Sequence, residues 1–218
     1  MSPGFVHWVL RTLDVDAARS FYEGVLEEGA PDVTKLPELA LARGAKPHWL
    51  GQLSVPDVAA STAAFVARRA LLLGNGYALR DPSGAILGLT SEVVPSRRDV
   101  LSEQLLTSDP MTATKDYGEL FGMTMRGHLD VPGHGVFETF AWGDGPIVGS
   151  LGDITGKPHI HPQWLFFFRV AELRSATAYV SDKGGHVIGP TTLPDGRQVA
   201  VCDDPQGAAF ALIEIPRS

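Results

Sequence analysis

Apolar runs typical of strands take turns along the chain with patterns of apolar and polar residues typical of helices. This order predicts a repeated strand followed by a helix. Apolar runs rich in β-branched and aromatic residues begin near residues 5, 48, 102 and 163, as is typical of strands. Each run leads into a helical pattern, most clearly at 57–72 and at 172–183, where a pair of glycines follows as a common helix-ending signal. The pattern therefore predicts an α+β fold with four strand-then-helix openings.

The two halves of the chain contain closely similar sequence segments. DPSGAILGL at 81–89 returns as DPQGAAFAL at 204–212, and PHWLGQLSVPDV at 47–58 matches PQWLFFFRVAEL at 162–173. Nearer each start, Asp14 aligns with Asp109 and Tyr22 with Tyr117. In DPxG, Asp and Pro favour the first turn positions and Gly accepts a positive φ, so each copy predicts a tight turn before an apolar strand. We expect an internal duplication, with a first lobe at 1–94, a linker at 95–101 and a second lobe at 102–218.

Composition and charge narrow the classes of function. The formal net charge of −7 disfavours a nucleic-acid partner, because a phosphate backbone would be repelled. Cys202 is the only cysteine, which excludes an intramolecular disulfide and a thiolate zinc site. The first residues lack a basic region followed by an apolar stretch, and no run approaches 18 apolar residues. These features predict a cytoplasmic protein without a membrane partner.

The order of elements, with LDVDAARSFYEGVL near the start and DPQGAAFAL near the end, resembles the vicinal oxygen chelate superfamily. This superfamily includes glyoxalases, bleomycin-resistance proteins and extradiol dioxygenases, and the resemblance covers essentially the whole chain. It implies duplicated βαβββ modules whose curled sheets form two cavities. The first lobe departs from the pattern, since residues 29–46 and 73–77 are too short for the usual strands. We therefore expect a degraded first cavity.

The resemblance also implies where a metal would bind, since family ligands are His or Glu on the first and last strands of paired modules. The corresponding positions here are held by His7, Leu50, Ser102, Leu165, Gly88 and Ala211. Of these, His7 is the one with a ligand-type side chain. We therefore expect no metal of the usual kind and no other cofactor, although Glu138 and Asp153 stay open as ligands because their strands cannot be aligned.

Candidate ligand-binding residues follow from strand alternation and from the cavity-facing strands that the resemblance implies. On the strand near 163–170, Phe167 shares one face with Leu165 and Arg169, whereas Phe166 and Phe168 share the other, expected against a helix. An apolar wall with a few polar groups can bind a planar small molecule. The predicted ligand-binding residues are Leu50, Gln52, Ser102, Gln104, Leu165, Phe167 and Arg169.

Two classes of function remain open. The first is a metal-independent protein of the bleomycin-resistance type, holding an apolar aromatic ligand such as a natural product in the second lobe. The second is an enzyme, namely a lyase, isomerase, cyclase or dioxygenase, acting on an aromatic or polyketide-like substrate. Such an enzyme is either metal-free, with acid or base groups from His7, Glu103, His134 and Glu138, or metal-dependent through ligands that the sequence does not place. The expected partner is a small molecule, and a homodimer is left open.

Overall fold

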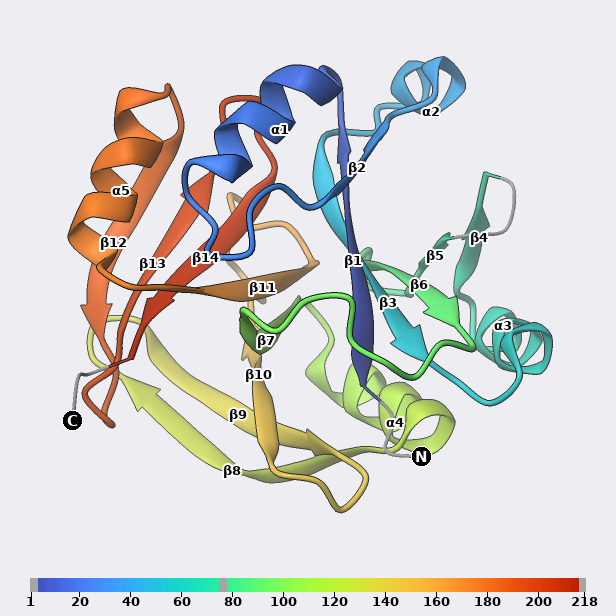
Figure 1. Cartoon of the computed structure of the whole chain (residues 1–218). Coiled ribbons are helices and arrows are strands. Elements are labelled where there is room, and N and C mark those ends of the chain that lie inside the picture. Colours follow the sequence, from blue (N-terminus) through green and yellow to red (C-terminus); the bar gives the residue numbers. More distant parts are fainter. Residues whose placement is uncertain (1–3, 75–77, 216–218) are drawn as a thin grey trace.

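The structure is a computed structural model that describes residues 4–74 and 78–215 (Figure 1). The elements of the first half are β1 (Phe5–Thr12), α1 (Val15–Glu23), β2 (Asp32–Lys35), α2 (Glu38–Ala42), β3 (His48–Ser54), α3 (Val58–Ala67), β4 (Leu71–Leu73), β5 (Ala78–Arg80) and β6 (Ile86–Thr90). The elements of the second half are β7 (Val100–Thr107), α4 (Pro110–Phe121), β8 (Met123–Val131), β9 (Gly135–Trp142), β10 (Ile147–Asp153), β11 (Gln163–Val170), α5 (Leu173–Asp182), β12 (His186–Thr192), β13 (Gln198–Asp203) and β14 (Ala209–Glu214).

Each half of the chain forms its own sheet. The second sheet has eight strands in the order β12-β13-β14-β11-β7-β10-β9-β8, so that two βαβββ modules join through antiparallel β7 and β11. The first sheet follows the same scheme with six strands, in the order β2-β1-β3-β6-β5-β4. The α+β fold with duplicated modules and two curled sheets is therefore confirmed.

The first module is the shortened one. It supplies β1 and β2, and β2 pairs parallel with β1 just as β10 pairs parallel with β7 in the second lobe. Part of the remaining edge of β1 is covered by the connection between the lobes, because the Ser96 amide donates to the Val6 carbonyl at 2.6 Å. The predicted shortness of 29–46 thus has a structural counterpart, whereas part of the second short stretch, residues 75–77, lies outside the described residues.

Most predicted element bounds agree with the structure, with two exceptions. The helix predicted at 57–72 is wrong at its end, because α3 stops at Ala67, Arg69 adopts a φ of 72° and the following leucines form β4. The second sheet begins at Val100, inside the predicted linker. The helix predicted at 172–183 matches α5 with its two caps. No helix of the described residues is long and apolar enough to cross a membrane.

The two sheets pack directly on one another through an aromatic core. The rings of Phe5 and Phe166 lie 5.2 Å apart, and those of Trp49 and Phe168 lie 4.6 Å apart, both between the lobes. Phe166 and Phe168 therefore pack on the first sheet, and the prediction that a helix covers them is wrong. The helices lie at the flanks of the core instead, where α1 is beside α5 and α3 is beside α4 (Figure 1).

Candidate ligand-binding faces

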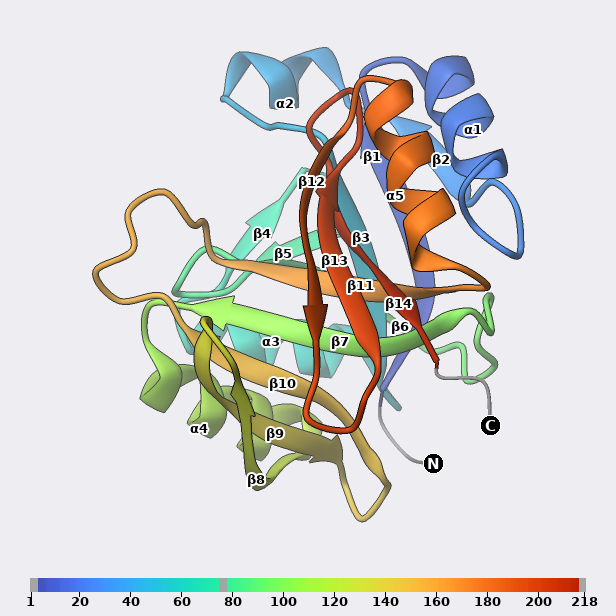
Figure 2. The same cartoon turned by 90° about the vertical axis from the view of Figure 1, so that its left-hand side faces the viewer.

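Each sheet has an inner face, packed on the other lobe, and an outer face directed away from it. Because side chains alternate along a strand, the core contacts of Trp8, Trp49 and Phe166 assign the neighbouring residues to the outer faces. The outer face of the second sheet is concave, since its edge strands β8 and β12 curl toward one another (Figure 2). His134, in the turn after β8, lies 3.1 Å from Thr191 Oγ1 on β12.

The outer face of the second sheet brings together four of the predicted ligand-binding residues. Ser102 on β7 is directly opposite Phe167 on β11, and Gln104 is directly opposite Leu165. Phe167 is partly exposed, whereas Leu165 is 1% exposed and Ala211, beside Phe167 on β14, is fully buried. The ring of Phe167 is therefore one of the apolar groups that this face still offers to a ligand.

Two polar side chains flank that ring. Ser102 Oγ donates to the Val148 carbonyl at 3.0 Å, and Gln104 Nε2 donates to Ser150 Oγ at 3.0 Å. These bonds hold both side chains in place through β10. Gln104 Oε1 accepts no hydrogen bond from the described residues, so it is available to a donor on a ligand.

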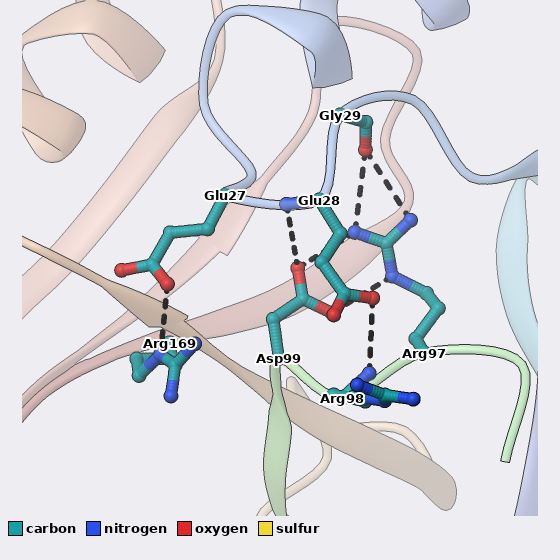
Figure 3. Close-up of polar contacts among 7 residues, drawn as sticks. All are labelled: Glu27, Glu28, Gly29, Arg97, Arg98, Asp99 and Arg169. Carbon is teal, nitrogen blue, oxygen red and sulfur yellow. Dashed lines mark hydrogen bonds and ion pairs between the residues drawn. The ribbon is translucent and has the colours of Figure 1, made fainter.

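Arg169 forms its side-chain hydrogen bond with the first lobe, unlike Ser102 and Gln104, which bond within the second sheet. Its Nε donates to Glu27 Oε2 at 2.8 Å (Figure 3). Its backbone amide donates to the Asp99 carbonyl at 2.7 Å. Glu27 belongs to the loop after α1, so the charge of Arg169 is already partnered by the first lobe. Its role in ligand binding stays a prediction.

The other two predicted ligand-binding residues, Leu50 and Gln52, lie on the outer face of the first sheet. Three directly opposed pairs form this face along β1 and β3. They are His7 with Gln52, Val9 with Leu50, and Arg11 with His48. The predicted ligand-binding residues thus divide between two separate faces. Sequence reasoning missed Arg11 and His48, although two-residue alternation from His7 and Leu50 places them on the same face.

The side chain of Glu103 does not lie on the outer face of the second sheet. It lies between Ser102 and Gln104 on β7, so alternation directs it to the inner face, where it is 6% exposed and accepts a hydrogen bond from Trp142 Nε1. Burial raises the pKa of Glu103 to about 8, against the opposing effect of the Trp142 bond. A ligand on the concave face cannot touch this carboxyl.

The other candidate acid–base groups are scattered. Glu138 is exposed on β9, directly opposite the core residue Leu151, and so lies on the inner side of the sheet. His134 is an exposed residue at the sheet edge. His7 is on the first outer face, where its Nε2 is 3.3 Å from Asp32 Oδ2. The structure therefore brings none of the four together with Phe167.

The residues present do not fit the metal of the usual family site. On the second sheet the family positions carry the hydroxyl of Ser102 and the alkyl side chains of Leu165 and Ala211, which are not carboxylate or imidazole donors. Across residues 4–74 and 78–215 no group of three or more His, Cys, Asp or Glu is placed to hold an ion. Burial raises the pKa of the Cys202 thiol to about 12, so this side chain is not a thiolate at neutral pH.

Two pockets lie away from both outer faces. One of about 250 Å³ lies between α1 and α5 and is lined by residues that include Phe21, Tyr179 and Lys183. The other, of about 230 Å³, lies beside α5 and includes Thr177 and Gln198. Neither contains a predicted ligand-binding residue.

Paired sheets of βαβββ modules, with strands of the two halves in equivalent order, define the vicinal oxygen chelate fold. The sequence model of the Glyoxalase/Bleomycin resistance protein/Dioxygenase superfamily matches residues 100–212, more than half of the chain, and the chain belongs to this superfamily. No curated protein sequence matches it.

Solved structures with the same fold span nearly all of the chain. The 2,3-dioxygenase LapB from Pseudomonas sp. KL28 is 14% identical, with 99% of this chain and 92% of that chain covered and a TM-score of 0.62. Homoprotocatechuate 2,3-dioxygenase from Brevibacterium fuscum, in complex with 3,4-dihydroxyphenylacetate, is 14% identical, with 99% and 82% covered and a TM-score of 0.63. The Mn(II)-bound glyoxalase from Novosphingobium aromaticivorans is 12% identical, with 96% and 81% covered and a TM-score of 0.59. At these identities the likeness establishes the fold alone.

Proposed function

We propose that this protein binds a small, planar, largely apolar molecule on the concave face of its second sheet, without a protein-bound metal. The observation that carries the proposal is the pairing of partly exposed Phe167 with Ser102, one step along the strands from Leu165 and Gln104. An aromatic ring beside a few fixed polar groups suits a flat ligand that carries a hydroxyl or amine. The ligand would stack on Phe167 and donate to Gln104 Oε1.

The side chains on the concave face support a binding role over an enzymatic one. The structure of homoprotocatechuate 2,3-dioxygenase contains the flat molecule 3,4-dihydroxyphenylacetate, so a protein of this fold can hold such a ligand, but that protein is a dioxygenase. Here the positions that carry the ligands in the family are occupied by Ser102, Leu165 and Ala211, and Glu103 and Glu138 face the other way. We therefore propose that the concave face binds a ligand and does not catalyse a dioxygenase reaction. A cytoplasmic location and a homodimer remain predictions from the sequence.

Calorimetric titration with 1-naphthol, a planar apolar molecule with one hydroxyl, tests the proposal. We expect saturable binding that is unchanged after dialysis against a chelator. Phe167→Ala should weaken it by roughly 5- to 100-fold, as expected for loss of one stacked and buried ring. Tyr179→Ala, which removes a half-buried ring between α1 and α5, is the control and should bind like the parent.

Two results would overturn the proposal. One is equal affinity of Phe167→Ala and the parent protein for 1-naphthol. The other is binding that disappears with chelator and returns with a divalent ion, because this would require a metal at a site that the residues described above do not form.

A further inference from the structure

The outer face of the first sheet has a chemistry of its own. At one end of it Arg11 and His48 are directly opposite each other on β1 and β3, both partly buried. Side chains opposed in this way have Cβ atoms about 5 Å apart, so one small ligand can reach both. The next pair along the strands, Val9 and Leu50, is 6% and 1% exposed. That covered pair leaves little surface for a long apolar chain and limits the ligand to a compact one.

Arg11 has no partner for its charge among the described residues. Burial is what lowers its pKa, with no contribution from a neighbouring carboxylate. Asp32, on the adjacent strand β2, is paired with His7 at 3.3 Å instead. A guanidinium stays protonated in proteins, and a half-buried cation without an anion loses hydration without compensation. A carboxylate, which accepts two parallel guanidinium hydrogen bonds, would supply the missing partner.

His48 specifies a second group on the ligand. Its Nδ1 lies 2.8 Å from the Lys46 carbonyl, and because a carbonyl oxygen can only accept, Nδ1 must carry the proton. Burial, together with the charge of Arg11, lowers the pKa of His48, so the ring is neutral at pH 7. Its Nε2 is therefore an acceptor that needs a donor. A hydroxyl next to the carboxylate would meet this need.

The fold does not require this pair of side chains. When Asp14 is aligned with Asp109 and Trp49 with Trp164, the second-lobe counterparts of Arg11 and His48 are Leu106 and Gln163, which are again directly opposed. The second lobe thus builds the same two strands without a cation or an imidazole. The pairing of Arg11 with His48 is a property of the first lobe and not of the shared module.

We propose that Arg11 and His48 form a second binding site, on the outer face of the first sheet, for a compact 2-hydroxycarboxylate. The carboxylate accepts hydrogen bonds from the Arg11 guanidinium, and the 2-hydroxyl donates to His48 Nε2. The site is independent of the ligand proposed for the second lobe, since the two faces point in opposite directions from the shared core.

Nuclear magnetic resonance of the labelled parent protein provides the first test, and it needs no variant. Three probes are compared, namely 2-hydroxybutanoate, butanoate and 1,2-butanediol. We expect 2-hydroxybutanoate to shift the Arg11 Nε–H and His48 ring signals saturably, butanoate to bind about fivefold or more weakly, and the diol to leave both signals unchanged. No shift with 2-hydroxybutanoate would overturn the site, and equal affinity for butanoate would overturn the role of the hydroxyl.

Variants provide the second test. Arg11→Gln should weaken 2-hydroxybutanoate binding on the order of tenfold or more, because it removes the charge-assisted hydrogen bonds. Arg98→Gln changes an exposed arginine in the connection between the lobes and should leave the affinity unchanged. Phe167→Ala should also leave it unchanged, which separates this site from the one in the second lobe. Equal binding by Arg11→Gln and the parent would overturn the proposal.

Discussion

Tyr22 of the first lobe donates a hydrogen bond to Asp204 of the second lobe, with 3.1 Å between the hydroxyl and Oδ2. The same hydroxyl accepts a hydrogen bond from Trp49 Nε1 at 3.1 Å. Asp204 is the aspartate of DPQG, and its other oxygen accepts from the amides of Gln206 and Ala208 within the turn. The turn is therefore both a chain reversal and the docking point for a helix of the other lobe.

The reciprocal contact is present at the other end of the core. Tyr117 of the second lobe donates to Asp81 Oδ2 at 3.1 Å, and its hydroxyl accepts from Trp164 Nε1 at 3.1 Å. Asp81 is the aspartate of DPSG. Each lobe thus contributes a turn to the other lobe's tyrosine, which gives a physical reason for the same turn sequence in both halves.

These contacts predict that Tyr22→Phe and Tyr117→Phe each lower the free energy of unfolding by about 1 to 3 kcal/mol, because each leaves a buried carboxylate and an indole N–H without their shared partner. The two sites share no residue, so the double variant should show the sum. Urea denaturation measures both. Tyr179→Phe removes a longer bond of 3.4 Å to the Ser20 carbonyl and serves as control, with little expected change. Stability equal to the parent in both single variants would contradict this account.

The duplication was predictable because short sequence segments repeat in the two halves. Aligned aspartates, the tyrosine pair and the DPxG turns are short signals, and the fold and the shortened first module follow from them. The partners of these residues were not predictable. Tyr22 and Asp204 are 182 positions apart, and no local sequence pattern predicts that the two lobes contact each other through this pair.

The surroundings of the candidate site residues were predictable only in part. Ser102, Glu103 and Gln104 cannot all face one ligand, because neighbours on a strand point to opposite faces, so alternation alone could have removed Glu103. The covering of Phe166 by the first sheet required knowledge of how the lobes pack. The pairing of Arg169 with Glu27 likewise joins segments from different lobes.

A buried ion pair fastens the connection between the lobes. Asp99, which is fully buried, accepts from Arg97 Nε at 2.9 Å and from Nη2 at 2.6 Å, and the Arg97 guanidinium also donates to the Gly29 carbonyl (Figure 3). The Glu28 amide donates to the same carboxylate at 3.4 Å. The loop after α1 is thereby held against the start of the second sheet.

We expect Asp99→Asn to lower the free energy of unfolding by about 3 to 5 kcal/mol, because it leaves the Arg97 charge buried without its partner. The Arg97→Met/Asp99→Leu double variant should recover much of this loss. Urea denaturation measures the difference, and limited proteolysis between residues 91 and 99 reports opening of the connection. Asp195→Asn, at the exposed pair with Arg197, should change stability by less than about 1 kcal/mol. Similar losses in both variants would count against a special role for the buried pair.

The three consecutive phenylalanines of β11 should respond differently to truncation. Phe166 and Phe168 are fully buried between the sheets, so replacing either with alanine should cost about 3 to 5 kcal/mol of stability. Phe167 is partly exposed on the concave face, and its truncation should cost clearly less. Thermal and urea unfolding of the three variants measure the contrast. If Phe167→Ala were the most destabilised of the three, the assignment of faces on β11 would be wrong.

Glu103 should make stability depend on pH between its unfolded and folded pKa values. Burial raises its pKa to about 8 in the folded protein, while in the unfolded chain the carboxyl titrates near the ordinary glutamate value of 4.5. The folded state therefore holds more protons in this range, and the free energy of unfolding should fall as pH rises from about 4.5 to about 8. Glu103→Gln keeps an acceptor for Trp142 Nε1 but cannot ionise, so it should be more stable than the parent at pH 8 and lack this slope. Glu138→Gln changes an exposed carboxyl and should retain the slope. Urea denaturation at half-unit pH steps measures all three proteins, and parallel profiles for Glu103→Gln and the parent would show that the carboxyl is ionised in the folded core.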